Sequence, residues 1–205
     1  GESFYTPQAV MTFGEQGFGG ISRNFHNLIR ERILPPQFNK PAPIVANTWE
    51  SFGFNITQEK SVKFAEKAAL AGADTVVLDD GWFRSDDKSG LGDWVLCKEK
   101  FAGGIEACVN KLNELNLNFG IWFEPEMISE NSALYKTHPD WVLNNGDEGS
   151  LSRNQYVLDL TNPAVVDYIT DLVTGFLSHY PVTYLKWDAN RYISEAGSKY
   201  TKNQG

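Results

Sequence analysis

Short apolar runs alternate with amphipathic helical patterns from residue 43 onward, and this alternation limits the possible folds more than any other feature of the chain. The apolar runs occupy residues 44–46, 75–78, 119–123 and 182–186. Apolar residues recur at helical spacing between them, within 57–71, 105–115 and 163–176. Continuous apolar strands are typical of a parallel sheet covered by helices on both faces. The sequence therefore predicts an α/β fold.

Carboxylates or tryptophans follow several of these predicted strands, as at Trp49, Asp79, Glu124 and Asp188. An open doubly wound sheet gathers ligand-binding groups near one switch point. A closed barrel instead brings the C-terminal ends of all its strands around one axis. We therefore predict a partial (β/α)8 TIM barrel. Since a complete barrel takes about 250 residues, the chain has room for roughly the first four to five βα units.

A proline-rich stretch between residues 35 and 43 separates this pattern from a different segment. Residues 1–42 begin with several glycines and continue into an amphipathic run at 21–34. We predict two parts: a linker carrying one helix at 1–42, and the N-terminal half of the barrel at 43–205. The linker is too short to be a domain, so we expect it to lead from a larger domain outside the chain.

Composition excludes several classes of protein. With 41% hydrophobic and 21% charged residues among 205, the chain is an ordinary globular protein. A net charge of −8 disfavours nucleic acid. No apolar run approaches the ~20 residues of a membrane span, and no basic segment followed by an apolar one opens the chain, so we expect a cytoplasmic protein. Cys97 and Cys108 lack the spacing of a zinc site, and Cys108 is predicted to be a core thiol.

Aromatic residues make up 13% of the chain, with six tryptophans. Indole faces cover the apolar faces of sugar rings, which favours a carbohydrate site. The alternative is that these rings belong to the core.

Asp79 and Asp80 are adjacent at a strand end, where the chain can turn both carboxylates toward a ligand. Such paired acceptors suit sugar hydroxyls. They would also suit a metal ion, but the three histidines at 26, 138 and 179 lie elsewhere in the sequence, and we predict no metal. A third alternative is that they cap the next helix.

Glu124 and Glu126 flank Pro125, which places both carboxylates in the loop after a strand. Either could be catalytic, but we favour ion pairs with a neighbouring Lys or Arg, because Trp122 offers the better substrate contact. Arg153 could hold a ligand oxygen, and its alternative is an ordinary surface position.

Lys186 and Asp188 share one face of an extended strand. A lysine beside Asp188 would lower the pKa of the carboxyl group and keep it ionised, as a glycosidase nucleophile must be. The alternative is a salt-bridged strand end. The second carboxylate that such a reaction needs is not assigned, and we expect it beyond residue 205.

Five ordered motifs resemble those of the family 36 α-galactosidases. They are Trp-Glu-Ser-Phe-Gly-Phe-Asn at 49–55, Leu-Asp-Asp-Gly-Trp-Phe at 78–83, Trp-Phe-Glu-Pro-Glu-Met at 122–127, His-Pro-Asp-Trp-Val-Leu at 138–143 and Lys-Trp-Asp-Ala-Asn-Arg at 186–191. By this resemblance, residues 1–42 join a missing N-terminal β-sandwich domain to the barrel. The nucleophile strand is then the fourth of the barrel, which makes the predicted strand at 156–160 an accessory one.

The resemblance also implies roles for individual residues. Asp188 matches the nucleophile that forms a covalent galactosyl-enzyme, while Asp79 and Asp80 match the pair that binds the galactose 4- and 6-hydroxyls. The positions that match or lie near sugar contacts are Trp49, Trp122, Arg153, Lys186 and Asn190. The family's acid/base lies on a later strand. Two departures, Ala189 for the usual Met and a missing Pro within 101–104, remove no functional group.

We therefore expect a retaining, exo-acting glycoside hydrolase that releases terminal α-linked galactose from oligosaccharides such as melibiose or raffinose. It would need no cofactor, and the full-length protein would form a homo-oligomer. One alternative is a galactosyltransferase of the raffinose or stachyose synthase type. Another is a catalytically inactive sugar-binding fragment, and we expect the isolated chain itself to be inactive.

Overall fold

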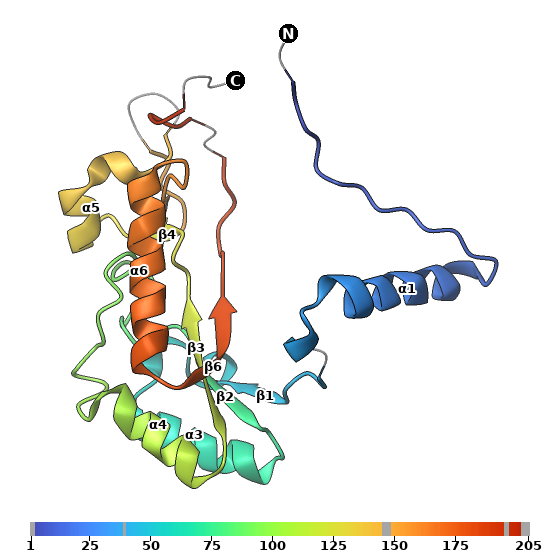
Figure 1. Ribbon diagram of the computed structural model, residues 1–205. Coiled ribbons are helices and arrows are strands. Elements are labelled where there is room, and N and C mark those ends of the chain that lie inside the picture. Colours follow the sequence, from blue (N-terminus) through green and yellow to red (C-terminus); the bar gives the residue numbers. More distant parts are fainter. Residues whose placement is uncertain (1–2, 39, 145–148, 195–196, 202–205) are drawn as a thin grey trace. The chain divides into compact units, whose positions relative to one another are not determined.

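The computed structural model describes residues 3–38, 40–144, 149–194 and 197–201 (Figure 1). The chain divides into two compact units, Gly1–Ala42 and Pro43–Gly205. Among the described residues, no helix is both long enough and apolar enough to cross a membrane.

The first unit contains one main helix. Helix α1, Gly17–Leu28, continues into a π-helical turn at Ile29–Ile33, and a short 3-10 turn follows at Pro36–Phe38. The helix predicted at 21–34 is therefore present but begins four residues earlier. Its first turn is glycine-rich and carries no apolar period, so the pattern could not mark it.

The second unit is built on a parallel sheet with strand order β1-β2-β3-β6. The strands are β1 at Val45–Asn47, β2 at Thr75–Leu78, β3 at Asn118–Phe123 and β6 at Val182–Trp187. The predicted apolar runs match these strands to within one residue at either end. The α/β fold with a parallel sheet is thus confirmed.

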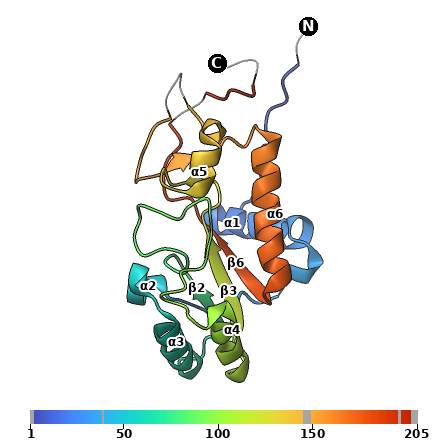
Figure 2. The same ribbon diagram turned by 90° about the vertical axis from the view of Figure 1, so that its left-hand side faces the viewer.

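Three longer helices connect the strands of this sheet: α3 at Gln58–Leu70, α4 at Gly104–Glu114 and α6 at Pro163–His179. Thr57 begins α3, because its side-chain oxygen accepts a hydrogen bond from the Lys60 N–H at 3.3 Å. Asn162 begins α6 in the same way, with its side chain accepting from the Ala164 N–H. Helices α3 and α4 lie side by side against one face of the sheet (Figures 1 and 2).

Two segments leave this regular alternation. After β1, a four-residue helix α2, Trp49–Phe52, and a 3-10 turn, Gly53–Asn55, form the first loop. After β3, an excursion contains β4 at Met127–Ile128, α5 at Ala133–Thr137, a 3-10 turn at Pro139–Trp141 and β5 at Tyr156–Val157. Strand β5 pairs with β4 in an antiparallel ribbon outside the main sheet, so the strand predicted at 156–160 is shorter than expected and accessory.

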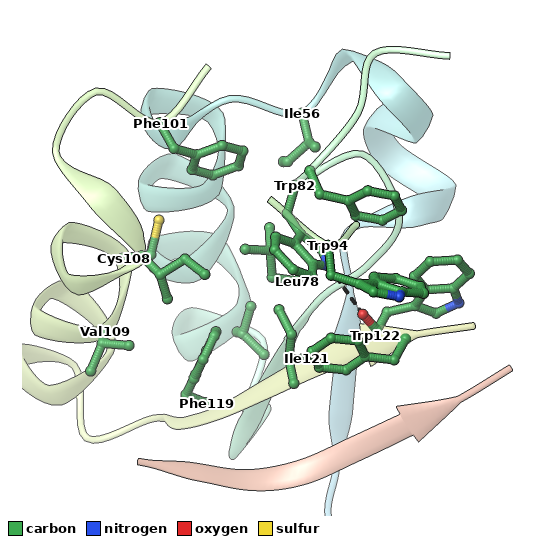
Figure 3. Packing of buried hydrophobic residues seen from close by; sticks show 14 of the residues in the cluster. Ile56, Leu78, Trp82, Trp94, Phe101, Cys108, Val109, Phe119, Ile121 and Trp122 are labelled. Atoms are coloured by element: carbon green, nitrogen blue, oxygen red, sulfur yellow. Dashed lines mark hydrogen bonds between the residues drawn. The ribbon is translucent and has the colours of Figure 1, made fainter. Parts of the chain in front are cut away.

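The main core lies between the sheet and helices α3 and α4, and Figure 3 shows its packing. The indole N–H of Trp82 donates to the Trp122 carbonyl at 3.0 Å, the hydrogen bond dashed in Figure 3. Trp82, Trp94 and Trp122 are all buried. Half of the six tryptophans therefore contribute to the core. Cys108 is a core thiol as predicted, and burial raises its pKa to about 11.

Candidate active site

The C-terminal ends of the four parallel strands meet at one edge of the sheet, where they line a cavity of about 380 Å³. This volume is within the usual range for small-molecule sites. The cavity contains every side chain predicted from the sequence as catalytic or sugar-binding: Trp49, Asp79, Asp80, Trp122, Arg153, Lys186, Asp188 and Asn190. A larger cavity of about 550 Å³, beside the β4–β5 ribbon, contains none of them.

Asp79 connects three strands through its carboxylate, which is almost fully buried. One oxygen accepts hydrogen bonds from the Asn47 side chain at 2.6 Å and from the Lys186 ammonium at 2.8 Å. The other accepts the backbone N–H of Asp80. The sequence predicted a contact between Lys186 and Asp188, whereas the ammonium group donates to Asp79. The β2 and β6 strand ends are thereby joined by an ion pair that is buried on the Asp79 side and partly exposed on the Lys186 side.

Asp80 forms a two-pronged ion pair with Arg84, a residue that the sequence reasoning missed. The Arg84 Nε donates to one carboxylate oxygen at 2.8 Å and a terminal nitrogen donates to the other. Burial raises the pKa of Asp80, and Arg84 offsets part of that effect. Neither aspartate caps a helix, since α4 begins after Gly103 with no side-chain cap, so that alternative is wrong. The available signal was an arginine four residues after an acidic pair.

Asp188 accepts three hydrogen bonds. The Trp122 indole N–H and the Asn190 side-chain amide each donate to Oδ2 at 2.8 Å, and the Ala189 N–H donates to Oδ1 at 3.0 Å. Partial burial raises the pKa of Asp188, but the hydrogen bonds from Trp122, Asn190 and Ala189 outweigh it, with a smaller contribution from the Lys186 charge. The predicted lowering of this pKa is confirmed. Its principal cause is hydrogen bonding rather than the lysine.

Glu124 and Glu126 do not form the ion pairs that we favoured from the sequence. Glu124 is completely buried, and no Lys or Arg lies within ion-pair distance of it in the described part of the chain. Its Oε1 accepts the Asn190 backbone N–H, while Glu126 accepts from the Trp187 indole at 3.1 Å. The ion-pair prediction was wrong because the loop after β3 directs Glu124 inward, where neutral groups donate to it.

The remaining predicted residues surround this centre. Arg153, whose backbone φ is 52°, donates to the Asn190 carbonyl at 2.9 Å. Trp49 packs edge-on against Phe54, with ring centroids 5.1 Å apart, and its backbone N–H donates to the Asn47 side-chain oxygen at 2.8 Å. Trp122 is only 1% exposed and lies parallel to the Phe83 ring, so the contact that the structure assigns to it is the one with Asp188.

The site therefore combines carboxylates with neutral donors and with the cationic side chains of Lys186 and Arg84. Within residues 3–38, 40–144, 149–194 and 197–201, no group of three or more His, Cys, Asp or Glu side chains is arranged to hold a metal ion. The Asp188 carboxylate lines the cavity together with Asp79 and Asp80, which form ion pairs with Lys186 and Arg84. Such a set suits recognition of a polyhydroxylated ligand.

The fold and the site together define an α/β protein with a carboxylate-rich pocket at the C-terminal edge of a parallel sheet, the place where such enzymes bind and act on small molecules. The sequence model of the melibiase family matches residues 3–205. The chain therefore belongs to the melibiase family.

Individual relatives agree with this placement. The chain is 45% identical over 202 residues to "Alpha-galactosidase AgaA" of Geobacillus stearothermophilus, covering 97% of this chain and 28% of that protein. It is 40% identical to "Probable alpha-galactosidase C" of Aspergillus terreus, covering 29% of that protein. A crystal structure of a variant of the Geobacillus protein in complex with raffinose superposes with a TM-score of 0.87 at 43% identity, covering 92% of this chain and 27% of the other. The chain thus spans under a third of the length of these relatives.

Proposed function

We propose that the chain provides the nucleophile and most of the galactose-binding side chains of a retaining α-galactosidase. The observation that carries this proposal is the environment of Asp188. This carboxylate is held ionised by three hydrogen bonds, in one cavity with Asp79 and Asp80. Related proteins named α-galactosidases support the choice of substrate class.

The substrates that we propose are α-galactosides such as melibiose and raffinose. Related crystal structures contain raffinose in one case and stachyose in another. In this chain, Asp79 and Asp80 would accept hydrogen bonds from the galactose 4- and 6-hydroxyls. Lys186, Asn190 and Arg153 would donate to other ligand oxygens, and Trp49 would cover a ring face.

In the proposed reaction, one oxygen of Asp188 attacks the anomeric carbon as the bond to the leaving sugar breaks. A second carboxylic acid protonates the departing oxygen, and water later releases galactose from the covalent ester with net retention. The resemblance to family 36 assigns that acid to a later strand. The residues of this chain hold the nucleophile ionised and orient the galactose.

We further propose that the four-stranded sheet is part of a (β/α)8 barrel and that residues 1–42 lead into it from a preceding domain. Strands β1 and β6 are the edges of the sheet, and side chains on both are exposed, including Val45, Tyr184 and Trp187. Further strands would cover these edges in a closed barrel. This proposal is supported by the finding that the chain matches only 28% of the Geobacillus relative and 27% of its crystal structure.

The test is to trap the covalent intermediate. The full-length protein is incubated with an activated aryl α-galactoside and examined by intact-protein mass spectrometry. We expect a mass increase of one hexosyl unit, located by peptide mapping to Asp188. In Asp188→Asn the adduct should vanish and turnover should fall by about three orders of magnitude or more.

The matched control is Asp140→Asn, which changes an exposed carboxylate beside the other cavity and should leave adduct formation intact. An adduct that persists in Asp188→Asn would overturn the nucleophile assignment. Absence of turnover in the wild-type protein would instead favour a sugar-binding role. Transfer of galactose to a sugar rather than to water would show in the products as a longer oligosaccharide.

A further inference from the structure

The side chains of Glu124 and Gln155 form a buried polar pair, and Glu124 lines the same cavity as Asp188. Glu124 is 0% exposed and Gln155 is 1% exposed. The amide nitrogen of Gln155 lies 3.4 Å from Glu124 Oε2, at the outer limit of a hydrogen bond. The amide oxygen of Gln155 is buried and has no hydrogen-bond partner among the residues that the structure describes. An unsatisfied buried oxygen is costly, so this arrangement needs an explanation.

A proton on Glu124 would give the Gln155 amide oxygen a donor. A carboxylate only accepts hydrogen bonds, whereas a carboxylic acid has one O–H to donate. The oxygen and nitrogen of a glutamine amide can exchange places by a half-turn, which costs little in shape. After that half-turn, the Glu124 O–H faces the Gln155 oxygen, and the amide N–H groups take the position that the oxygen leaves. An ionised Glu124 leaves the amide oxygen without a donor.

The surroundings of Glu124 also disfavour a negative charge. Burial has the largest effect and raises the pKa of Glu124, while hydrogen bonds from Asn190 oppose it. Charged side chains on neighbouring elements also change the pKa of Glu124. Asp188 raises the pKa further, and Arg84 has a weaker, opposite effect.

The other oxygen of Glu124 connects this pair to the nucleophile. Glu124 Oε1 accepts the Asn190 backbone N–H, and the Asn190 side chain donates to Asp188 Oδ2 at 2.8 Å. A second tether on Asn190 comes from Arg153, which donates to its carbonyl oxygen at 2.9 Å. Gln155, Glu124, Asn190 and Asp188 thus form one continuous chain of hydrogen bonds.

We propose that Glu124 is a positioning residue that works as a neutral carboxylic acid: it donates to Gln155 and fixes the Asn190 backbone, so that the Asn190 amide holds Asp188 in place. This role rests on the proposed function of Asp188 as nucleophile. Neutrality matters because a second anion near Asp188 would make ionisation of the nucleophile harder.

The protonation state is measured directly, without reference to activity. Full-length protein labelled with ¹³C at the glutamate side-chain carboxyl carbons is followed by NMR as the pH is varied. The resonance that disappears in Glu124→Gln is assigned to Glu124. We expect it at a protonated-acid chemical shift at neutral pH, well above the about 4.3 at which an ordinary glutamate titrates. A carboxylate chemical shift at neutral pH would overturn the proposal.

Kinetics test the positioning role with the conservative variant. Glutamine reproduces a neutral acid, since it offers one acceptor to Asn190 and one donor to Gln155. We expect Glu124→Leu to lower kcat by about ten- to a hundredfold and to move the acidic limb of the pH–rate profile upward, as Asn190 loses its anchor. Glu124→Gln should restore most of that loss and the original acidic limb. Glu126→Gln, in the same loop, is the matched control.

The outcomes separate the two proposals. If Glu124→Gln is as impaired as Glu124→Leu, then Glu124 acts as an anion and its neutral role is wrong. If Glu124→Leu does not fold, the NMR titration and the glutamine variant still decide the question. If Asp188→Asn retains full turnover, the nucleophile assignment fails, while the NMR result for Glu124 stands independently.

Discussion

The ionisation of Asp188 depends on a residue that the sequence assigned to a different task. From the sequence we predicted that the Trp122 indole contacts the sugar. In the structure its ring is buried and its indole N–H donates to Asp188. Of the groups that lower the pKa of Asp188, this hydrogen bond has the largest effect. Trp122 thus stabilises the charged form of Asp188, the proposed nucleophile, whatever contact its edge makes with a ligand.

Replacing Trp122 by phenylalanine tests this function. The change keeps an aromatic ring and removes one hydrogen bond to a charged acceptor, which is typically worth about 1.5–3 kcal/mol. The pKa of Asp188 lies below its ordinary value, so activity should be retained above that pKa and lost as the pH falls through it. With the donor removed the pKa rises, and the acidic limb of kcat/KM should begin at higher pH, as measured in a pH–rate profile.

Trp94→Phe is the control, because Trp94 belongs to the same aromatic cluster and its indole does not donate to Asp188 in the described part of the chain. An unchanged acidic limb in Trp122→Phe would show that the indole N–H does not set the ionisation of Asp188.

Sequence reasoning found which residues meet at this site but not how they pair. The eight predicted side chains share one cavity because strand ends in a parallel sheet meet at one edge. The partner of Lys186, in contrast, depends on strand register, and β3 and β6 shift register between Phe119 and Gly120. Nothing in the local sequence marks that irregularity. Glu124 was misjudged for the same reason, since its partners Gln155 and Asn190 are 31 and 66 residues away in the sequence. Arg84, in contrast, was missed although its partner Asp80 is only four residues away.

At the level of elements, the helices α3, α4 and α6 were predictable because each repeats its apolar residues over several turns. Helix α2 and strand β4 were not, since four- and two-residue elements are too short to show a period. Strand β5 was predicted at 156–160 but is only two residues long. The loops that carry Trp49 and Asp80 are therefore held in place by contacts with residues elsewhere in the chain. Lys100 provides one such contact.

The Lys100 ammonium joins two loops by donating to three backbone carbonyl oxygens: that of Phe54 at 2.6 Å in the loop after β1, and those of Gly81 and, at 2.8 Å, Arg84 in the loop after β2. Gly81 has a φ of 97°, a left-handed conformation that favours glycine, so the turn after Asp80 is fixed both by its backbone and by this lysine. A single side chain, Lys100, therefore fixes the loop after β1 relative to the loop after β2.

We expect Lys100→Met to loosen both loops. Methionine fills much of the space but leaves three carbonyl oxygens without their donor, at a cost of about 1.5–3 kcal/mol in the free energy of unfolding. Because Phe54, Asp80 and Arg84 line the cavity, KM for the galactoside should rise several-fold, with a smaller change in kcat. Urea denaturation and steady-state kinetics measure the two effects.

Lys98→Met is the matched control, since Lys98 is exposed and two residues away. Equal KM values for Lys100→Met and wild type, at reduced stability, would restrict Lys100 to a purely structural role.

At the scale of the whole molecule, the second unit presents two sheet edges. Strands β1 and β6 each pair on one side within the described part of the chain, and apolar side chains beside them are exposed: Ile44 is 62% exposed and Trp187 is 46% exposed. Unpaired strand edges with apolar side chains are templates for association with other chains. Asp188, the proposed nucleophile, directly follows the edge strand β6, so the order of that edge and the geometry of the site are linked.

We therefore predict that the 205-residue chain, expressed alone, associates through these edges and shows little or no turnover. Size-exclusion chromatography should show polydisperse oligomers, and thermal unfolding should lack a sharp transition. Ile44→Lys places a charge at the β1 edge, a change that disfavours edge-to-edge pairing, and should shift the distribution toward monomer without restoring activity. Thr183→Lys, on β6, repeats the test at the other edge. A monodisperse, cooperatively unfolding chain with turnover would contradict this, because four strands would then suffice both to close the core and to complete the catalytic site.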